Sequence, residues 1–335
     1  MSRDRGPRRL RRLDRSALIA ASVTVLSMTA SGCVVVHGER EVLPATTRAE
    51  AAKALQQFTN AYNAADKAYD SSLDAAHVTG ALGAIDAARL KAGKANSPSG
   101  NASHTPLKLS DVTYTIPKKA GWPRWFVADA AGNKGGTARW LLVFTRDGLN
   151  EPFQVAYLTL VAEGKVPEFQ KDADGWAEAV PANSAGLAAV PGELSKDYAG
   201  YLKSGADDVF ADGTHTSVWR ADRAKDAIRP GLATQYIDEP LANGAYAPLA
   251  LRTKDGGALV FFATHHYVKE TAHSGTSVPS PGTAVLALTT GEIKQSLMME
   301  FVSNEVALDP PKGAGGGRQV DVLGRIQGLT SAQGS

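Results

Sequence analysis

The pattern of apolar and polar positions predicts that helices come first and strands second in each half of the chain. Thr47 and Glu50 fit a capping box at the start of a helix. The apolar positions that follow are spaced by four and three residues, as on one helix face: Ala51, Leu55, Phe58, Tyr62, Ala65 and Tyr69. A second helix is expected over residues 73–92, although Gly80 and Gly83 weaken it.

Farther along, the alternation of apolar and polar residues becomes typical of β-strands. Four strands are expected in the first half, at residues 112–117, 125–127, 140–145 and 153–160. The second half begins with a helix marked by Leu194, Tyr198, Tyr201 and Leu202, and Val209 and Phe210 indicate another. Four strands are expected to follow, at residues 249–253, 258–267, 284–289 and 297–308. Helices followed by antiparallel strands favour the α+β class.

The two halves also share a local pattern, which favours two tandem α+β units. Five residues of the first half recur in the second at a constant offset: Leu141, Thr145, Asp147, Gly148 and Phe153 match Leu249, Thr253, Asp255, Gly256 and Phe261. The alternative is two unrelated hairpins that share the common Asp-Gly turn. In the order of its elements, a helix pair followed by an antiparallel sheet resembles the NTF2-like and cystatin-like class, which implies helices packed on a sheet in each unit.

The first residues have the features of an export signal. Residues 1–32 contain seven arginines and two acidic residues. The apolar stretch at residues 17–30 would reach only ~21 Å as a helix, which is too short to span the ~30 Å core of a membrane. It therefore indicates a signal peptide. Arg8-Arg9 and Arg11-Arg12 leave twin-arginine export open beside the general secretory route.

The sequence Ala30-Ser31-Gly32-Cys33 resembles the lipobox of bacterial lipoproteins, with alanine where leucine is usual. The resemblance implies cleavage after Gly32 and attachment of lipid to Cys33, the only cysteine of the chain. Two acyl chains give stable membrane anchoring. The alternative is an ordinary secretory signal with a chance cysteine. The whole chain is also similar to uncharacterised secreted lipoproteins of actinobacteria.

These observations predict the domain organisation of the chain. Five segments are expected: a signal peptide at 1–32, a tether at 33–45, a first α+β domain at 46–185, a second at 186–312, and a flexible tail at 313–335. Subtracting the charges of residues 1–32 from the totals of 36 and 34 leaves 29 basic and 32 acidic residues. This balance gives no general attraction for nucleic acid. The lack of a second cysteine excludes internal disulfides and cysteine-based zinc sites.

No pattern in the sequence assigns a catalytic, cofactor or metal site. His265 and His266 are adjacent in an expected strand and would point to opposite faces, and His273 lies in an expected loop, so a metal site is not predicted. Asp172 and Asp174 begin like a calcium loop, but its twelfth position is not a glutamate, which indicates a polar turn. Nucleophile-elbow and phosphate-loop motifs are absent from the sequence.

Trp122, Trp125 and Trp140 lie within a short stretch and would form either an exposed binding cluster or part of the core. The function expected is therefore binding by a lipoprotein, anchored through Cys33 on the extracytoplasmic face of the cell membrane. Its partner would be a protein, a wall component or a small molecule on the concave side of a sheet. The alternative is a cell-surface hydrolase that uses carboxylate and histidine acid–base chemistry in an NTF2-like pocket, with His215, His265 and Glu300 as the first residues to check.

Overall fold

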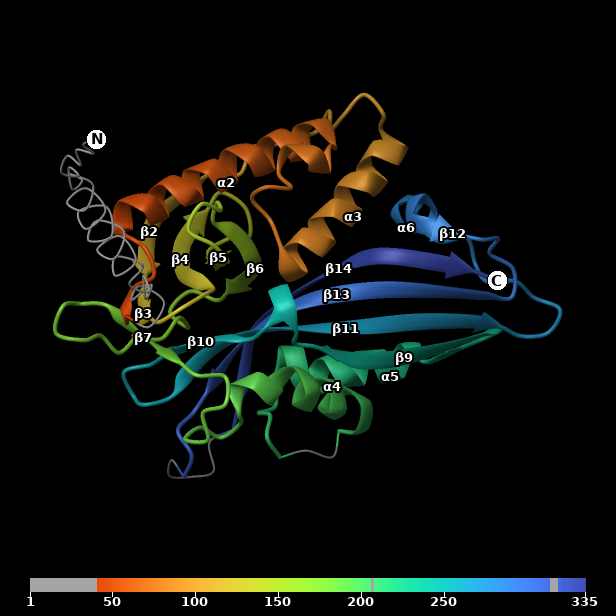
Figure 1. Ribbon diagram of the computed structural model, residues 1–335. Coiled ribbons are helices and arrows are strands. Elements are labelled where there is room, and N and C mark those ends of the chain that lie inside the picture. The colour runs from red at the N-terminus through yellow and green to blue at the C-terminus, as the bar shows by residue number, and fades with distance from the viewer. Residues whose placement is uncertain (1–40, 206–207, 314–318) are drawn as a thin grey trace, which may run out of the picture. The chain divides into compact units, whose positions relative to one another are not determined.

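The computed structural model describes residues 41–205, 208–313 and 319–335 (Figure 1). Helix α2 (Arg48–Ala68) begins at the predicted capping box. The Thr47 hydroxyl accepts a hydrogen bond from the Glu50 amide at 3.1 Å, and the Glu50 carboxylate accepts one from the Thr47 amide at 3.1 Å. The predicted face is confirmed, because Ala51, Leu55 and Phe58 are buried.

Helix α3 (Gly80–Asn96) begins later than expected. The residues before it, Ser71–Leu73, form the short 3-10 turn η2, capped by the Asp70 side chain. Gly80 has a φ of +54°, and a Cβ atom there would lie 2.5 Å from the carbonyl oxygen of Ala245. The helix start therefore depends on a glycine at a close backbone approach.

The four strands expected in the first half are confirmed as an antiparallel sheet of order β2-β4-β5-β6. Their bounds are Leu109–Thr115, Arg124–Gly132, Arg139–Arg146 and Gln154–Val161. Phe126 and Phe144 stack at 4.7 Å between ring centroids, on the side where Phe58 of α2 packs. The opposite side of this sheet joins a second apolar cluster, shared with the larger sheet.

The larger sheet is ten-stranded and has the order β1-β3-β7-β10-β11-β13-β14-β12, with β8 and β9 off this path. The bounds of these strands are β1 Leu43–Pro44, β3 Pro117–Lys119, β7 Ala177–Val180, β8 Ile228–Arg229, β9 Leu232–Leu241, β10 Leu249–Arg252, β11 Ala258–Ala272, β12 Thr289–Thr290, β13 Ser296–Asp309 and β14 Asp321–Gly334. Strand β11 pairs with β13 along one edge, and with β10 and then β9 along the other. The β5–β6 and β10–β11 hairpins expected from the shared pattern are both present.

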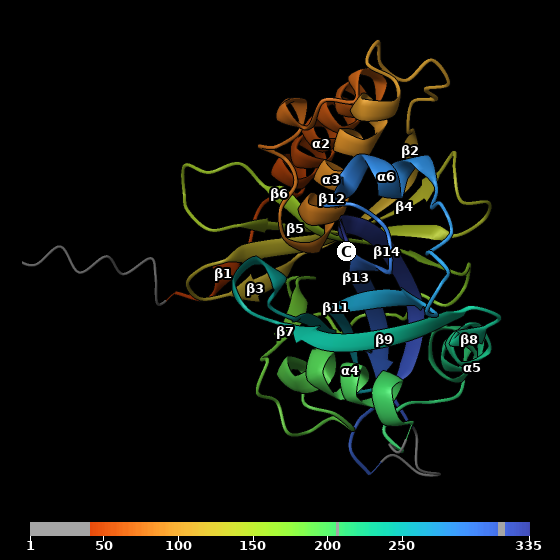
Figure 2. The ribbon, with the colours of Figure 1, turned by 90° about the vertical axis from the view of Figure 1, so that its right-hand side faces the viewer.

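Helices cover both faces of the larger sheet, as Figures 1 and 2 show. Helices α4 (Leu194–Ser204) and α5 (Trp219–Asp226), with the π-helical turn η4 (Thr214–Val218), lie on one face. Helix α3 lies on the other, where Ile85 packs against strands of both sheets. The helix expected over 194–202 is confirmed. The one expected at Val209 and Phe210 is not, since Phe210 forms a bridge with Val320.

Two predictions for the C-terminal part were wrong. Residues 283–288 form helix α6 (Thr283–Leu288) instead of a strand, because Leu288 packs against Ala88 and Ala92 of α3. The described part of the expected flexible tail forms strand β14, which pairs with β13 along its length. Gly328 suggests flexibility in the sequence, but here it makes room for Ile85: a Cβ atom would lie 2.4 Å from Ile85 Cγ2.

The expected division near residue 185 does not coincide with a break in the fold. Residues Val42–Ser335 form one compact unit. Strand β7 belongs to the expected first domain but pairs with β10 of the expected second domain. Strands β1 and β3 join the same sheet through β7. The structure is thus a mixed α+β fold with two sheets, in which both halves build the larger one.

Candidate functional site

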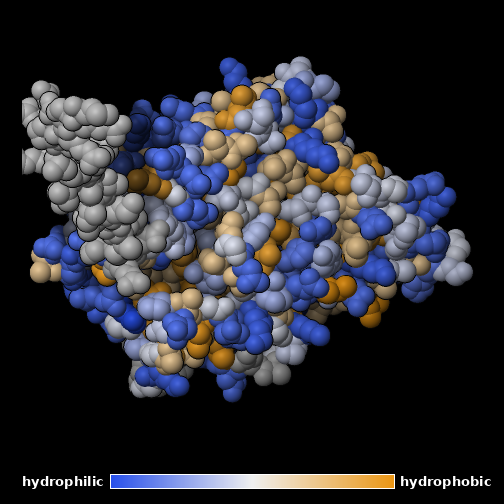
Figure 3. All heavy atoms as spheres, viewed as in Figure 1, coloured by the Kyte–Doolittle hydropathy of each residue, from blue (hydrophilic) through white to orange (hydrophobic). Residues whose placement is uncertain are grey.

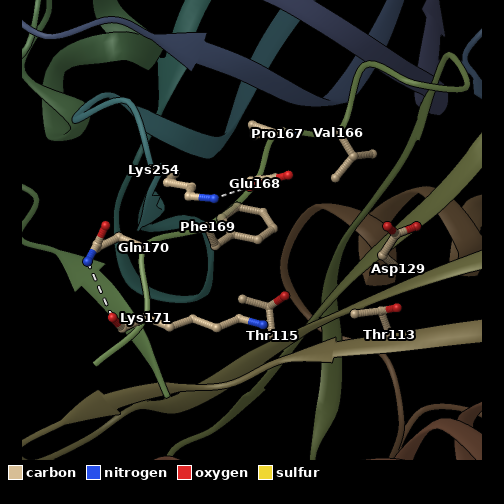
Figure 4. A pocket seen from close by; sticks show the side chains of 10 residues that line it. All are labelled: Thr113, Thr115, Asp129, Val166, Pro167, Glu168, Phe169, Gln170, Lys171 and Lys254. Atoms are coloured by element: carbon tan, nitrogen blue, oxygen red, sulfur yellow. Dashed lines mark hydrogen bonds and ion pairs between the residues drawn. The ribbon is translucent and has the colours of Figure 1, made fainter. Parts of the chain in front are cut away.

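A polar cleft lies where the small sheet meets the turn of the β10–β11 hairpin (Figure 4). Strands β2 and β4 contribute Thr113, Thr115 and Asp129 to its wall, and the turn contributes Lys254. The segment 166–171, which leads from β6 towards β7, forms the rest. The volume is about 530 Å³, within the range of ~300–1,000 Å³ that is typical of small-molecule sites.

The segment 166–171 is held in place by backbone contacts with the hairpin. The Gln170 amide donates to the Arg252 carbonyl at 2.9 Å, and the Lys254 amide donates to the Glu168 carbonyl at 2.8 Å. Phe169 is half-buried and packs against the apolar cluster between the sheets. Figure 4 shows its ring in the middle of the cleft, among polar side chains. The cleft therefore combines one aromatic surface with several hydrogen-bonding groups.

Charged residues of the cleft form two ion pairs. Lys254 Nζ lies 2.8 Å from Glu168 Oε2, and this contact raises the pKa of Lys254 and lowers the pKa of Glu168. Asp129 Oδ1 lies 2.6 Å from Arg139 Nε. The Lys171 ammonium has no hydrogen bond or ion pair within the described ranges, and Figure 4 shows it extending beside Thr115. The cleft thus offers an uncommitted cation, two threonine hydroxyls and an ion pair that is open to solvent.

In the neighbouring turn, the carboxylates of Asp172 and Asp174 bond to a lysine and to backbone amides. Lys118 Nζ lies 2.7 Å from Asp172 Oδ2 and 2.8 Å from Asp174 Oδ2. The other oxygen of Asp172 accepts from the backbone amides of Asp174 and Trp176. These contacts agree with the predicted polar turn. Across residues 41–205, 208–313 and 319–335, no group of histidine, cysteine and acidic side chains could hold a metal ion.

Two of the three residues to check for acid–base chemistry lie together on the larger sheet. His265 Nε2 is 2.8 Å from Glu300 Oε1, and His265 Nδ1 is 3.6 Å from Glu239 Oε2. Ser331 Oγ donates to the other oxygen of Glu300 at 2.6 Å. The serine therefore bonds to the carboxylate and not to the imidazole, so the group lacks the nucleophile–base contact of a hydrolytic triad.

His266 and His215 lie on the opposite face of the larger sheet, which α4 and α5 cover. His266 is buried, stacks on Phe301 at 4.9 Å, and has its pKa lowered to about 2 by burial and by Arg223 and Arg325. The His215 carbonyl accepts a hydrogen bond from the Tyr198 hydroxyl, and burial lowers the pKa of the His215 imidazole. The expected opposite orientation of His265 and His266 is confirmed. The three residues named for checking, His215, His265 and Glu300, are divided between the two faces.

Trp125 and Trp140 are buried in the clusters on opposite sides of the small sheet, so they belong to the core. Trp122 is half-buried, and the guanidinium groups of Arg124 and Arg146 lie 5.7 and 5.8 Å from its ring. On the face drawn in Figure 3, small apolar groups are dispersed among polar side chains.

Sequence reasoning missed the cleft. Its residues come from β2, β4, an irregular segment and a hairpin turn, which are far apart in the chain. Phe169 lies between Glu168 and Gln170 in a stretch without helical or strand periodicity. The strand with Thr113 and Thr115 and the hairpin turn with Lys254 were predicted, but only as elements of the fold. The feature of the sequence that comes nearest to indicating the cleft is Phe169, an aromatic residue between polar neighbours.

The comparisons with known proteins identify the family. A family model described as a domain of unknown function, DUF8094, matches residues 42–334, so the chain belongs to that family. An uncharacterized lipoprotein of Streptomyces coelicolor is 72% identical over 334 residues, with 100% of each chain covered. An uncharacterized lipoprotein of Streptomyces avermitilis is 58% identical over the same length and coverage.

A second uncharacterized lipoprotein of Streptomyces coelicolor is 29% identical over 218 residues, which cover 61% of this chain and 59% of the relative. No solved structure matches the chain. The similarity to uncharacterised actinobacterial lipoproteins is therefore confirmed. Cys33 lies outside the described residues. Among the helices that the structure describes, none has the length and apolar character needed to cross a membrane.

Proposed function

We propose that the protein is a lipoprotein anchored through Cys33 on the outer face of the cell membrane, where it binds a small polar ligand. The lipobox-like sequence before Cys33 and the names of the relatives support the anchor. The observation that carries the binding role is the cleft around Phe169, with its aromatic surface and uncommitted Lys171 ammonium.

The chemistry of the cleft favours a sugar-like ligand. A pyranose has one apolar face that can pack on an aromatic ring, and hydroxyls that both donate and accept hydrogen bonds. Phe169 supplies the ring, while Thr113, Thr115 and Lys171 supply polar partners. A wall glycan is a ligand of this kind and is present where an extracytoplasmic lipoprotein would work.

Binding is favoured over the alternative hydrolase by the contacts of His265. A hydrolase would need a nucleophile or an activated water next to the imidazole. Both imidazole nitrogens of His265 instead face the carboxylates of Glu300 and Glu239. The imidazole of His265 on β11 thus links β9 and β13 through these two carboxylates, which favours a structural role.

The finer architecture proposed is a tandem arrangement of two NTF2-like or cystatin-like units, in which β1, β3 and β7 of the first half have joined the sheet of the second. The helices α2 and α3 precede the small sheet, and α4 and α5 precede the long strands of the larger one. Both halves carry the Asp-Gly hairpin. The pairing of β7 with β10 would then have formed when the two units joined.

The binding role is tested with a β-1,4-linked N-acetylglucosamine trisaccharide as the probe. The mature lipoprotein in detergent micelles is titrated with it and followed by NMR or by calorimetry. We expect saturable binding, a large loss of affinity in Phe169→Ala, and a smaller loss in Lys171→Ala. Lys203→Ala on α4 is the matched control and should bind normally. Equal binding by all variants would contradict the assignment of the cleft.

A further inference from the structure

We infer that the end of the molecule around β1 rests on the lipid bilayer, with Leu149, Val42 and Leu43 at the level of the headgroups. This surface is distinct from the cleft and rests on the proposed lipid anchor at Cys33. It consists of Val42 with β1, the connection at residues 120–123 and the turn between β5 and β6.

The tether limits how far this end can lie from the membrane. Val42 stands nine positions after Cys33. A fully extended chain of this length reaches at most ~30 Å. A lipid attached at Cys33 would therefore keep the start of β1 close to the bilayer, whichever conformation the tether takes.

Contacts within the fold bring the three parts of this surface together. Arg124 Nη1 donates to the Leu43 carbonyl at 3.1 Å. Lys119 Nζ donates to the Trp122 carbonyl at 3.0 Å. Arg124 pairs with Arg146 across the β4–β5 ladder, so the turn after Arg146 leaves the sheet at the same end as β1. Figure 2 shows β1 and β3 on the left of the view.

Exposed apolar side chains concentrate on this surface. Over residues 41–205, 208–313 and 319–335, seven large apolar side chains are exposed. Three of them belong to this end: Leu149 is 75% exposed, Val42 60% and Leu43 41%. Trp122, in the connection at residues 120–123, is half-buried, and its ring lies by the guanidinium groups of Arg124 and Arg146. Apolar loop tips and tryptophan are typical of protein surfaces that contact the membrane interface.

The charges of the turn set the depth of contact. Asp147 and Glu151 flank Leu149 and are exposed. Carboxylates are costly to place within the hydrocarbon core. The turn would therefore reach the headgroup level and no deeper, and the acyl chains on Cys33 would supply most of the membrane affinity.

The test uses the absence of other cysteines in the mature chain. Leu149→Cys is labelled with a polarity-sensitive fluorophore in the full lipidated protein, because a Cys33 thioether does not react with a maleimide. Ile228→Cys is the matched control: Ile228 is 84% exposed and lies in β8, on the other side of the view in Figure 2. The labelled proteins are placed in vesicles of phosphatidylethanolamine and phosphatidylglycerol that carry a nitroxide lipid.

We expect the proteins to float with the vesicles, and the label at position 149 to be blue-shifted and quenched several-fold more than the label at 228. Val42→Cys should behave like Leu149→Cys. If the proteins float but the labels at 149 and 228 are quenched equally, or both emit as in water, the membrane contact of this surface is contradicted. The lipid anchor is supported in that case. If they do not float, the anchor fails and the inference fails with it.

Discussion

The face of the larger sheet that α4 and α5 cover and the cleft at Phe169 both contain charged residues, but these residues differ in their exposure to solvent. On the face that α4 and α5 cover, the side chains of Arg223 and Asp238 are 5% and 4% exposed, and Arg223 Nη1 lies 2.8 Å from each carboxylate oxygen of Asp238. In the cleft, Lys254 and Glu168 are 70% and 78% exposed. The buried pair cannot exchange its partner for a ligand, whereas the exposed pair can.

The buried charges form a connected group. Glu305 is fully buried, accepts a hydrogen bond from Thr264 at 2.7 Å, and lies 3.5 Å from Arg325. The guanidinium groups of Arg223 and Arg325 both lie over the ring of Trp219, at 4.9 and 4.5 Å. Charges removed from water need such partners to avoid a large cost. The comparison teaches that charged side chains can serve the fold alone, and that only those exposed to solvent are free to contact a ligand.

The largest effect is expected from breaking the buried pair. Arg223→Ala leaves Asp238 charged and without its partner, so the free energy of unfolding should fall by about 3–5 kcal/mol. Urea unfolding of the mature protein measures this change in the free energy of unfolding. Lys225→Ala on the same helix is the control, because Lys225 is 75% exposed. A similar loss in both variants would contradict the contrast between buried and exposed charges.

A pH-dependent effect is expected from the buried Asp74, which lies beside Asp86. Burial, together with the Asp86 carboxylate, raises the pKa of Asp74 to about 8 from its ordinary value of 3.8. The folded state therefore holds a proton that the unfolded state releases, and stability should fall as the pH rises from about 4 to about 8. Asp74→Asn should flatten this fall.

Urea midpoints at pH 5, 7 and 9 measure the effect. Asp147→Asn, at an exposed carboxylate, should follow the unmodified protein at every pH. Stability that falls between pH 5 and 9 as steeply in Asp74→Asn as in the unmodified protein would show that another group carries the dependence. Glu305 is the next candidate, since burial raises its pKa to about 7.

The smallest effect is expected from the exposed pair of the cleft. Lys254→Ala should leave the free energy of unfolding almost unchanged, because water and salt screen an ion pair at the surface. The same variant should alter binding of the trisaccharide, because it changes the charge of the cleft wall. Thermal unfolding and titration of one sample measure both. A large loss of stability without any change in binding would show that Lys254 serves the fold and not the ligand.

The elements that were predicted correctly are those determined by residues close together in the sequence. The capping box at Thr47 and the spacing of Ala51, Leu55 and Phe58 describe α2 correctly, since both features act within a few residues. The hairpin turns at Asp147 and Asp255 were predicted for the same reason.

The remaining elements depend on contacts that one sequence does not display. Strand β14 contains Gly324 and Gly328, which indicate flexibility locally but are needed where Leu160 and Ile85 approach. Strand β9 is rich in polar residues, because Asp238 points to the buried charges and Glu239 to solvent. The cleft brings together three distant segments, so it could not be predicted before the pairing of the strands was known.

Both proposals require that the protein is held at the membrane by a lipid on Cys33. Intact-mass analysis of the protein from the membrane fraction of the producing bacterium tests this directly, with Cys33→Ser as the control. We predict a chain that begins at Cys33 and carries the added mass of a diacylglyceryl group, while the control keeps its leader. An unmodified Cys33, or a protein released whole into the medium, would contradict the account.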